Sequence, residues 1–105
     1  MSATEAKSYA NNRLSAWGWG VDQFDSLDKL WTKESNWNYK AKNKSSGAAG
    51  IPQLIGGSNV PGFDNDYKIQ IEHGFSYIKT RYGSPNAAWN YHQKKRLVLM
   101  NKFIS

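Results

Sequence analysis

Apolar residues recur every three or four positions along two stretches of the chain, the spacing that places side chains on one face of an α-helix. The first set consists of Phe24, Leu27, Leu30 and Trp31. The second set consists of Ile71, Phe75, Ile78 and Tyr82. The pattern predicts one helix that follows Asp22, a residue type favoured at helix N-caps, and another helix that ends near Gly83.

Local capping signals predict a further helix at each end of the chain. Residues 2–5 (SATE) have the form of a capping box, so a first helix is expected to begin there and to run towards Ala16, before the sequence WGWG. Ser84 and Pro85 suit the N-cap and the first turn of a last helix. This helix is expected to continue through NAAWNYHQKKRLVLMNKFI.

The segment between the second and third helices, residues 43–66, reads NKSSGAAGIPQLIGGSNVPGFDND and is rich in turn-forming residues. It predicts a long irregular loop with at most a short hairpin, and long loops in small domains are usually functional or disordered. The 105 residues suffice for one hydrophobic core but not for two. We therefore expect a single compact domain over residues 1–105 that is mainly α, with little or no sheet.

Composition narrows the classes of partner and chemistry. The net charge of +6 implies an anionic partner such as nucleic acid, an acidic membrane surface or an anionic cell-wall polymer. The absence of cysteine excludes disulfides and thiol nucleophiles, and two histidines are too few for a metal cluster, so neither metal nor cofactor is expected. The N-terminal residues have no apolar run typical of a secretory signal, and no stretch approaches the roughly 18 apolar residues of a membrane span.

Glu34 has an unusual position in the second predicted helix. At about 100° per residue, it falls within the same sector, roughly 80° wide, as the apolar stripe that includes Leu27 and Trp31. A carboxylate at the inner end of an apolar face is partly desolvated, which raises its pKa and favours the protonated form that a general acid needs. On spacing alone, an alternative stays open: Glu34 could end the helix and turn to solvent or cap a backbone amide.

The loop that follows combines small residues with one amide. The segment 47–50 (GAAG) removes side-chain bulk where a backbone or a polymer passes closely, and Gln53 both donates and accepts hydrogen bonds. The other interpretation is a flexible linker. The residues Ile51 to Ile55 favour an anchored loop, because their apolar side chains suit a core. The sequence therefore predicts a groove lined by small residues beside Glu34.

The sequence ESNWNYKAKNKSSGAAGIPQ, residues 34–53, resembles the pattern E-S-x-x-N-x-x-A followed by G-A-x-G-(apolar)-x-Q of soluble lytic transglycosylases and goose-type lysozymes. It is most similar to the small Gram-positive and phage-associated members whose loop reads G-I-P-Q. The likeness continues through IQIEHGFSYIKTRYGSPNAAWN, residues 69–90, and covers roughly Val21 to Gln93. The resemblance implies a lysozyme-like α+β fold that is mainly helical.

The resemblance also implies roles for individual residues. Glu34 would be the sole catalytic acid and base, and Ser35 would help to fix its setting. Gln53 would bind sugar or acetamido groups of the substrate, and Tyr77 would line the cleft. Residues 88–90 (AWN), which include the substrate-binding candidates Trp89 and Asn90, would occupy the family's A-Y-N positions.

Two departures from the family pattern are visible. Trp89 stands where many relatives have tyrosine, so a phenol hydrogen bond to the acid is lost unless Tyr77 or Tyr91 supplies it. The tail KKRLVLMNKFIS also differs from the Gly-Trp-Tyr ending of the relatives.

The implied activity is cleavage of the bond between N-acetylmuramic acid (MurNAc) and N-acetylglucosamine (GlcNAc) in peptidoglycan, which leaves 1,6-anhydromuramyl ends. The implied partner is a peptidoglycan glycan strand, with no nucleic acid, and we expect a monomer or one domain of a larger protein. The expected location is the cell wall, outside the cell, or a phage particle.

Three alternatives remain at this stage. Asp64 or Asp66 could serve as the second carboxylate of a water-using muramidase, although turn formation is the preferred role for both. A basic nucleic-acid-binding module is the second alternative, although only KKR and KNK cluster. The third is a wall-binding module without chemistry, which the presence of Glu34 disfavours. We expect His92 to pack or meet solvent rather than to act as a base.

Overall fold

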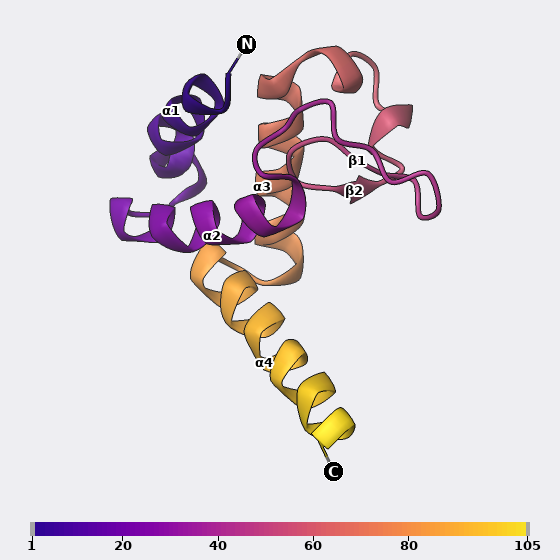
Figure 1. Cartoon of the computed structure of the whole chain (residues 1–105). Helices are drawn as coiled ribbons and strands as arrows, with labels where there is room; N and C mark the ends of the chain where they lie inside the picture. The colour runs from indigo at the N-terminus through magenta and orange to yellow at the C-terminus, as the bar shows by residue number, and fades with distance from the viewer. Residues whose placement is uncertain (1, 105) are drawn as a thin grey trace.

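The computed structural model describes residues 2–104, with side chains up to residue 100. Its long elements are four helices, α1 (Ala3–Arg13), α2 (Phe24–Ser35), α3 (Tyr67–Arg81) and α4 (Pro85–Ile104) (Figure 1). The strands β1 (Ala48–Ala49) and β2 (Leu54–Ile55) pair antiparallel, with Ala48 opposite Ile55. The expectation of a mainly helical domain with little sheet is therefore confirmed, and the short hairpin lies in the long loop.

The capping signals at both ends of the chain are confirmed. Ser2 Oγ accepts a hydrogen bond from the Glu5 backbone N–H (3.2 Å), and the Ser2 N–H donates to the Glu5 carboxylate (3.2 Å). Helix α1 ends at Arg13, and the residues up to Trp17 form a 3₁₀ turn instead of continuing the α-helix to Ala16. Before α4, Ser84 Oγ accepts from the Ala87 N–H (3.2 Å).

The prediction that Asp22 caps the second helix is wrong. Residues Val21–Gln23 form a 3₁₀ turn, and α2 begins only at Phe24. An N-cap residue needs an extended backbone, whereas Asp22 lies inside a helical turn and its carboxylate accepts from Gln23 Nε2 (3.4 Å). The chain thus enters α2 through continuous helical turns without a side-chain cap.

Helix α3 has the predicted apolar face and a capped start. Asp66 is its N-cap and accepts from the Lys68 N–H (2.8 Å). Ile71, Phe75 and Ile78 are buried, while Tyr82 lies just past the helix end and is only partly buried. Gly83 follows with φ +93°, a left-handed conformation that glycine adopts without strain.

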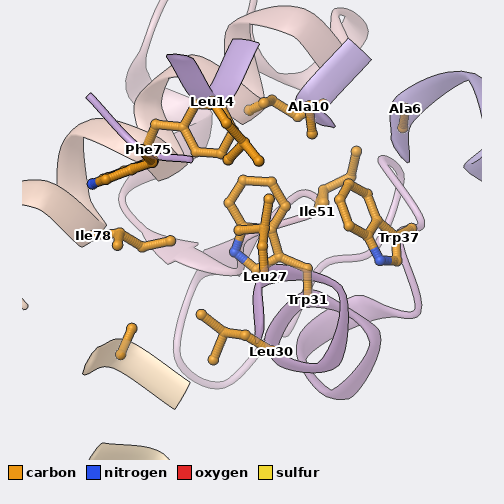
Figure 2. Packing of buried hydrophobic residues seen from close by; sticks show 13 residues of the cluster. Ala6, Ala10, Leu14, Leu27, Leu30, Trp31, Trp37, Ile51, Phe75 and Ile78 are labelled. Carbon is orange, nitrogen blue, oxygen red and sulfur yellow. The ribbon is translucent and has the colours of Figure 1, made fainter. Parts of the chain in front are cut away.

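The core is built around tryptophan and phenylalanine rings (Figure 2). The Trp31 ring stacks on Phe75 at a centroid distance of 5.5 Å and meets Trp37 edge-on at 5.2 Å. Gly74 of α3 packs directly against this ring. A Cβ at Gly74 would lie 2.6 Å from Trp31 Cζ2 and 3.0 Å from Pro52 Cβ, so a larger residue would clash there. Helices α2 and α3 and the loop therefore meet at one tightly packed point.

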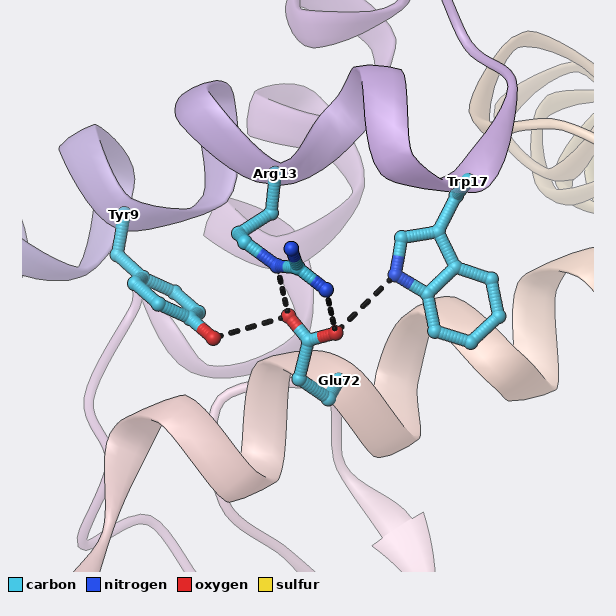
Figure 3. Close-up of polar contacts among 4 residues, drawn as sticks. All are labelled: Tyr9, Arg13, Trp17 and Glu72. Carbon is cyan, nitrogen blue, oxygen red and sulfur yellow. Dashed lines mark hydrogen bonds and ion pairs between the residues drawn. The ribbon is translucent and has the colours of Figure 1, made fainter.

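A polar cluster joins the N-terminal helix to α3 (Figure 3). The Glu72 carboxylate accepts hydrogen bonds from Tyr9 Oη (3.0 Å), from Arg13 Nε and Nη2 (2.9 and 2.8 Å) and from Trp17 Nε1 (3.2 Å). Hydrogen bonding to Arg13 is the main cause that holds the pKa of Glu72 below its usual range. This carboxylate is fully engaged in holding α1 against α3.

Helix α4 begins beside α2 and then leaves the body of the molecule, so that its second half projects away from the other helices (Figure 1). Four consecutive apolar side chains on this half are largely exposed, namely Leu97, Val98, Leu99 and Met100. None of the described helices is both long and apolar enough to cross a lipid bilayer.

Candidate active site

Glu34 lies on the last turn of α2 and faces an open cavity of about 370 Å³. The cavity walls come from the loop, from the end of α3 and from α4. The residues that line it besides Glu34 are Pro52, Gln53, Leu54, Ile55, Tyr77, Tyr82 and His92. A smaller hollow of about 30 Å³ continues beneath the acid towards Leu30, Trp31 and Gly74. The prediction that Glu34 shares a direction with the apolar stripe agrees with this arrangement.

The surroundings of Glu34 favour the protonated form of its carboxyl group. Glu34 is exposed overall, but partial burial of its carboxyl raises the pKa of Glu34, and the charge of Lys33 opposes this effect. Among the described residues, whose side chains extend to residue 100, no hydrogen bond or ion pair engages this carboxyl. Helix α2 continues through Ser35 to a left-handed cap at Asn36, so Glu34 is neither the last helical residue nor a cap, although its side chain is exposed to solvent as the alternative expected.

The loop that faces Glu34 is held from below by Gln70, a fully buried residue of α3. Gln70 Oε1 accepts from the Ile51 N–H (2.8 Å), and Gln70 Nε2 donates to the carbonyls of Tyr39 and Phe63 (both 2.9 Å). A Cβ at Gly50 would lie 2.6 Å from Gln70 Oε1. The absence of a side chain at Gly50 therefore leaves room for the Gln70 amide.

This arrangement corrects the prediction of a groove lined by small residues. Among the described residues, the segment 47–50 contributes nothing to the cavity around Glu34, and residues 52–55 form the loop wall instead. The small side chains at Gly50 and Gly74 admit protein atoms, Gln70 in one case and Trp31 in the other. Close packing of the loop on α3 explains them without a substrate.

Gln53 and Ser35 both fasten the loop. Gln53 Nε2 donates to the carbonyls of Gly50 (2.9 Å) and Ala41 (3.2 Å), which leaves its side-chain oxygen to meet a ligand in the cavity that Gln53 lines. Ser35 Oγ donates to the Ile51 carbonyl (2.7 Å). Ser35 does not line the cavity, so its hydroxyl positions the loop beside Glu34 rather than facing a substrate.

The structure brings two unexpected side chains to Glu34 and leaves two expected ones outside. Tyr77 lines the cavity as anticipated, but so do Tyr82 and His92. Trp89 packs against the hydrophobic core, Asn90 is exposed, and neither is among the described residues that line the cavity.

A helical register explains why His92 faces Glu34. His92 follows the buried Ala88 by four residues, so both lie on the face of α4 turned towards α2. Burial lowers the pKa of His92, and the nearby charges of Lys33, Lys95 and Arg81 lower it further. The neutral imidazole is therefore favoured beside Glu34.

Glu34 is the one carboxylate in the cavity wall. All eight acidic residues lie within the described part of the chain. Asp64 accepts from Ser58 Oγ (2.7 Å) and Asp66 caps α3, and neither lines the cavity. No group of three or more His, Cys, Asp or Glu within residues 2–104 is placed to share a metal ion.

No protein-family model matches the chain, and neither a curated protein nor a solved structure matches it. Support for a function therefore comes from the motif pattern and from the cavity around Glu34.

Proposed function

We propose that the protein is a lytic transglycosylase that cleaves the MurNAc-β-1,4-GlcNAc bond of peptidoglycan. The observation that carries the proposal is the position of Glu34, a lone carboxylate with a raised pKa at the wall of an open cavity. Its partner would be a glycan strand in the cell wall, met either outside the cell or by a phage particle. No metal or cofactor enters the reaction.

In the proposed reaction Glu34 acts first as acid and then as base. Protonated Glu34 gives its proton to the glycosidic oxygen as the bond from that oxygen to MurNAc C1 breaks. The acetamido oxygen of the same sugar stabilises the cationic C1. The C6 hydroxyl then attacks C1, and the Glu34 carboxylate takes the hydroxyl proton. The products are a 1,6-anhydromuramyl end and a GlcNAc end, and Glu34 returns to its protonated form.

The remaining cavity residues have positioning roles in this proposal. The free side-chain oxygen of Gln53 accepts a hydrogen bond from a sugar hydroxyl or acetamido N–H. Tyr77 and Tyr82 offer ring faces and hydroxyl groups to the sugars. Replacing Gln53 with Ala is expected to cost a few kcal/mol of transition-state stabilisation at most (~1–3 kcal/mol), as for other positioning groups.

A water-using muramidase is the second candidate, and the position of His92 favours it. Asp64 and Asp66 are engaged elsewhere, whereas the neutral His92 imidazole lines the same cavity as Glu34. Such an imidazole can accept a proton from water, which fills the role of the missing second carboxylate. In this case water rather than the C6 hydroxyl would attack C1.

The two candidates differ in their products. Mass spectrometry of digested peptidoglycan is expected to reveal muropeptides lighter by one water than lysozyme products, and digestion in oxygen-18 water is expected to leave these ends unlabelled. Labelled reducing ends that disappear in the variant His92→Gln would establish the muramidase. The variant Glu34→Gln is expected to release neither product, and Asp64→Asn serves as the matched acid-to-amide control that retains activity. Full activity in Glu34→Gln would exclude both candidates.

A further inference from the structure

The charges around the Glu34 cavity are strongly asymmetric. The chain beyond Glu72 contains no acidic residue, and this part supplies the end of α3 and all of α4. Its basic residues are Lys79, Arg81, Lys94, Lys95, Arg96 and Lys102. The side of the cavity built by α3 and α4 therefore carries positive charge only.

Three cations lie close to the cavity. Lys33 precedes Glu34 in the chain, and Lys95 follows His92 by three residues on α4, close to the same helix face. The Arg81 guanidinium carbon lies 6.0 Å from the ring centroid of Tyr77 and 5.8 Å from that of Tyr82, and both rings line the cavity. The charges of all three cations also act on His92. We call these three residues, Lys33, Arg81 and Lys95, the cationic rim.

The cationic rim has no acidic partner among the described residues. The ion pairs among the described residues join Lys7 to Asp28, Arg13 to Glu72 and Lys29 to Asp25, and none includes a residue of the rim. Lys33 favours the charged form of its neighbour Glu34, whereas burial, the larger effect, disfavours that form and raises the pKa of Glu34. Like charges gathered without a counter-charge repel one another, and an incoming anion relieves this repulsion.

We infer, on the basis of the proposed function, that the cationic rim of Lys33, Arg81 and Lys95 determines specificity by binding a carboxylate of the glycan beside the scissile bond. MurNAc carries such a group on its lactyl ether, and the stem peptide carries others. Arg81 is the strongest candidate for direct contact, because its planar guanidinium matches a carboxylate and the rings of Tyr77 and Tyr82 support it. A neutral polymer of GlcNAc lacks the group that the rim would bind.

Binding to the inactive variant Glu34→Gln tests this inference without turnover. The probes are a GlcNAc-MurNAc tetrasaccharide with free lactyl carboxylates, the same tetrasaccharide with stem peptides, and neutral chitotetraose. By calorimetry at low salt, a carboxylate-bearing probe is expected to bind about tenfold more tightly than chitotetraose. Tighter binding of the stem-free probe than of chitotetraose would identify the lactyl carboxylate as the group that the rim binds. Tighter binding of the peptide-bearing probe alone would identify a carboxylate of the stem peptide.

Substitutions in the same background identify the residues responsible. Arg81→Gln is expected to bring the affinity of the carboxylate-bearing probe to that of chitotetraose, and Lys95→Gln to lower it less. Lys44→Gln, an exposed lysine in the loop, is the control that leaves discrimination intact. Equal affinity of all probes for the Glu34→Gln variant would overturn the inference and leave the proposed function standing. A lack of binding by every probe would overturn both.

Discussion

Glu34 on α2 and His92 on α4 line the same cavity, and burial shifts the pKa of each towards its neutral form. The pKa of the carboxyl is raised and that of the imidazole is lowered. Burial therefore favours the uncharged form of both groups, whereas Lys33, Arg81 and Lys95 of the surrounding rim are positively charged. In the proposed mechanism, the raised pKa favours the protonated Glu34 that donates its proton.

The pH dependence of activity follows from the raised pKa of Glu34. A general acid must be protonated, so kcat/KM is expected to fall as pH rises through the pKa of Glu34, on a limb above the usual range of a carboxyl. Lys33 opposes the upward shift, and Lys33→Gln should therefore move this limb to higher pH. Rates on soluble peptidoglycan fragments across pH measure the limb, with Lys44→Gln as the control. An unchanged limb in Lys33→Gln would contradict the prediction.

The variant Glu34→Gln is expected to be at least as stable as the parent at neutral pH. Because the folded pKa of Glu34 exceeds its unfolded value, the folded state binds the proton more tightly, and stability falls as pH rises through the folded pKa. Glutamine does not titrate and avoids this loss. The gain should be below about 1 kcal/mol, because solvent screens a partly exposed group. Urea unfolding at neutral pH and at a pH below the usual carboxyl pKa measures it, and the gain should vanish in acid.

The variant Glu72→Gln, unlike Glu34→Gln, is expected to be less stable than the parent at neutral pH. The folded pKa of Glu72 is lowered, first by its hydrogen bond with Arg13, so its contribution to stability is present above the unfolded pKa and is lost as pH falls through the folded pKa. The amide cannot accept the four bonds that the carboxylate accepts. We expect a loss of about 1–2 kcal/mol at neutral pH. The same urea experiment measures it, and an equal loss at low pH would count against a charge-based cause.

Gly74→Ala tests the crossing of α3 over α2. Alanine in place of glycine stabilises a helix by roughly 1 kcal/mol, but overpacking of a rigid core costs about 1–3 kcal/mol. The new Cβ would lie 2.6 Å from Cζ2 of the buried Trp31 ring and 3.0 Å from Pro52 Cβ, and the adjacent hollow of about 30 Å³ is small, so the net effect should be destabilising. Thermal and urea unfolding measure it. Ser76→Ala, on an exposed position of α3, is the control that should change little.

Gln70→Leu removes the amide that holds the loop while nearly conserving volume. The Ile51 N–H and the carbonyls of Tyr39 and Phe63 lose their partner, and unsatisfied buried groups cost roughly 1–3 kcal/mol each before relaxation. We expect a stability loss of about 2–4 kcal/mol, with activity falling even in the variant that remains folded. Gln93→Leu on the exposed surface of α4 is the matched control. A folded, fully active Gln70→Leu protein would show that the loop needs no such anchor.

The helices were predictable wherever their signals are local. The capping box at Ser2 and the Ser84-Pro85 pair form bonds within one turn, so sequence neighbours suffice to identify them. The prediction that Asp22 caps α2 was wrong because a 3₁₀ turn precedes the helix. The choice between this turn and an N-cap depends on packing rather than on residue type.

The candidate site was only partly predictable for the same reason. The direction of Glu34 follows from helical periodicity within α2, and the structure places it in the cavity. Neither His92 nor Gln70 carries a local mark of its role, because each depends on how α3 and α4 pack against elements far away in the sequence. The Ala88 to His92 spacing was the one available signal, and it becomes meaningful only when α4 is known to face α2.

The anchoring of the loop by Gln70 also sets an order of events during synthesis. Gln70 comes after the loop in the chain, so Tyr39, Ile51 and Phe63 all leave the ribosome before the residue that joins them. Closing these contacts requires α3 to have emerged and packed, and the entropy of the intervening chain opposes closure until then. A nascent chain that ends before α3 therefore already contains Glu34 and Gln53, yet has no cavity in which to use them.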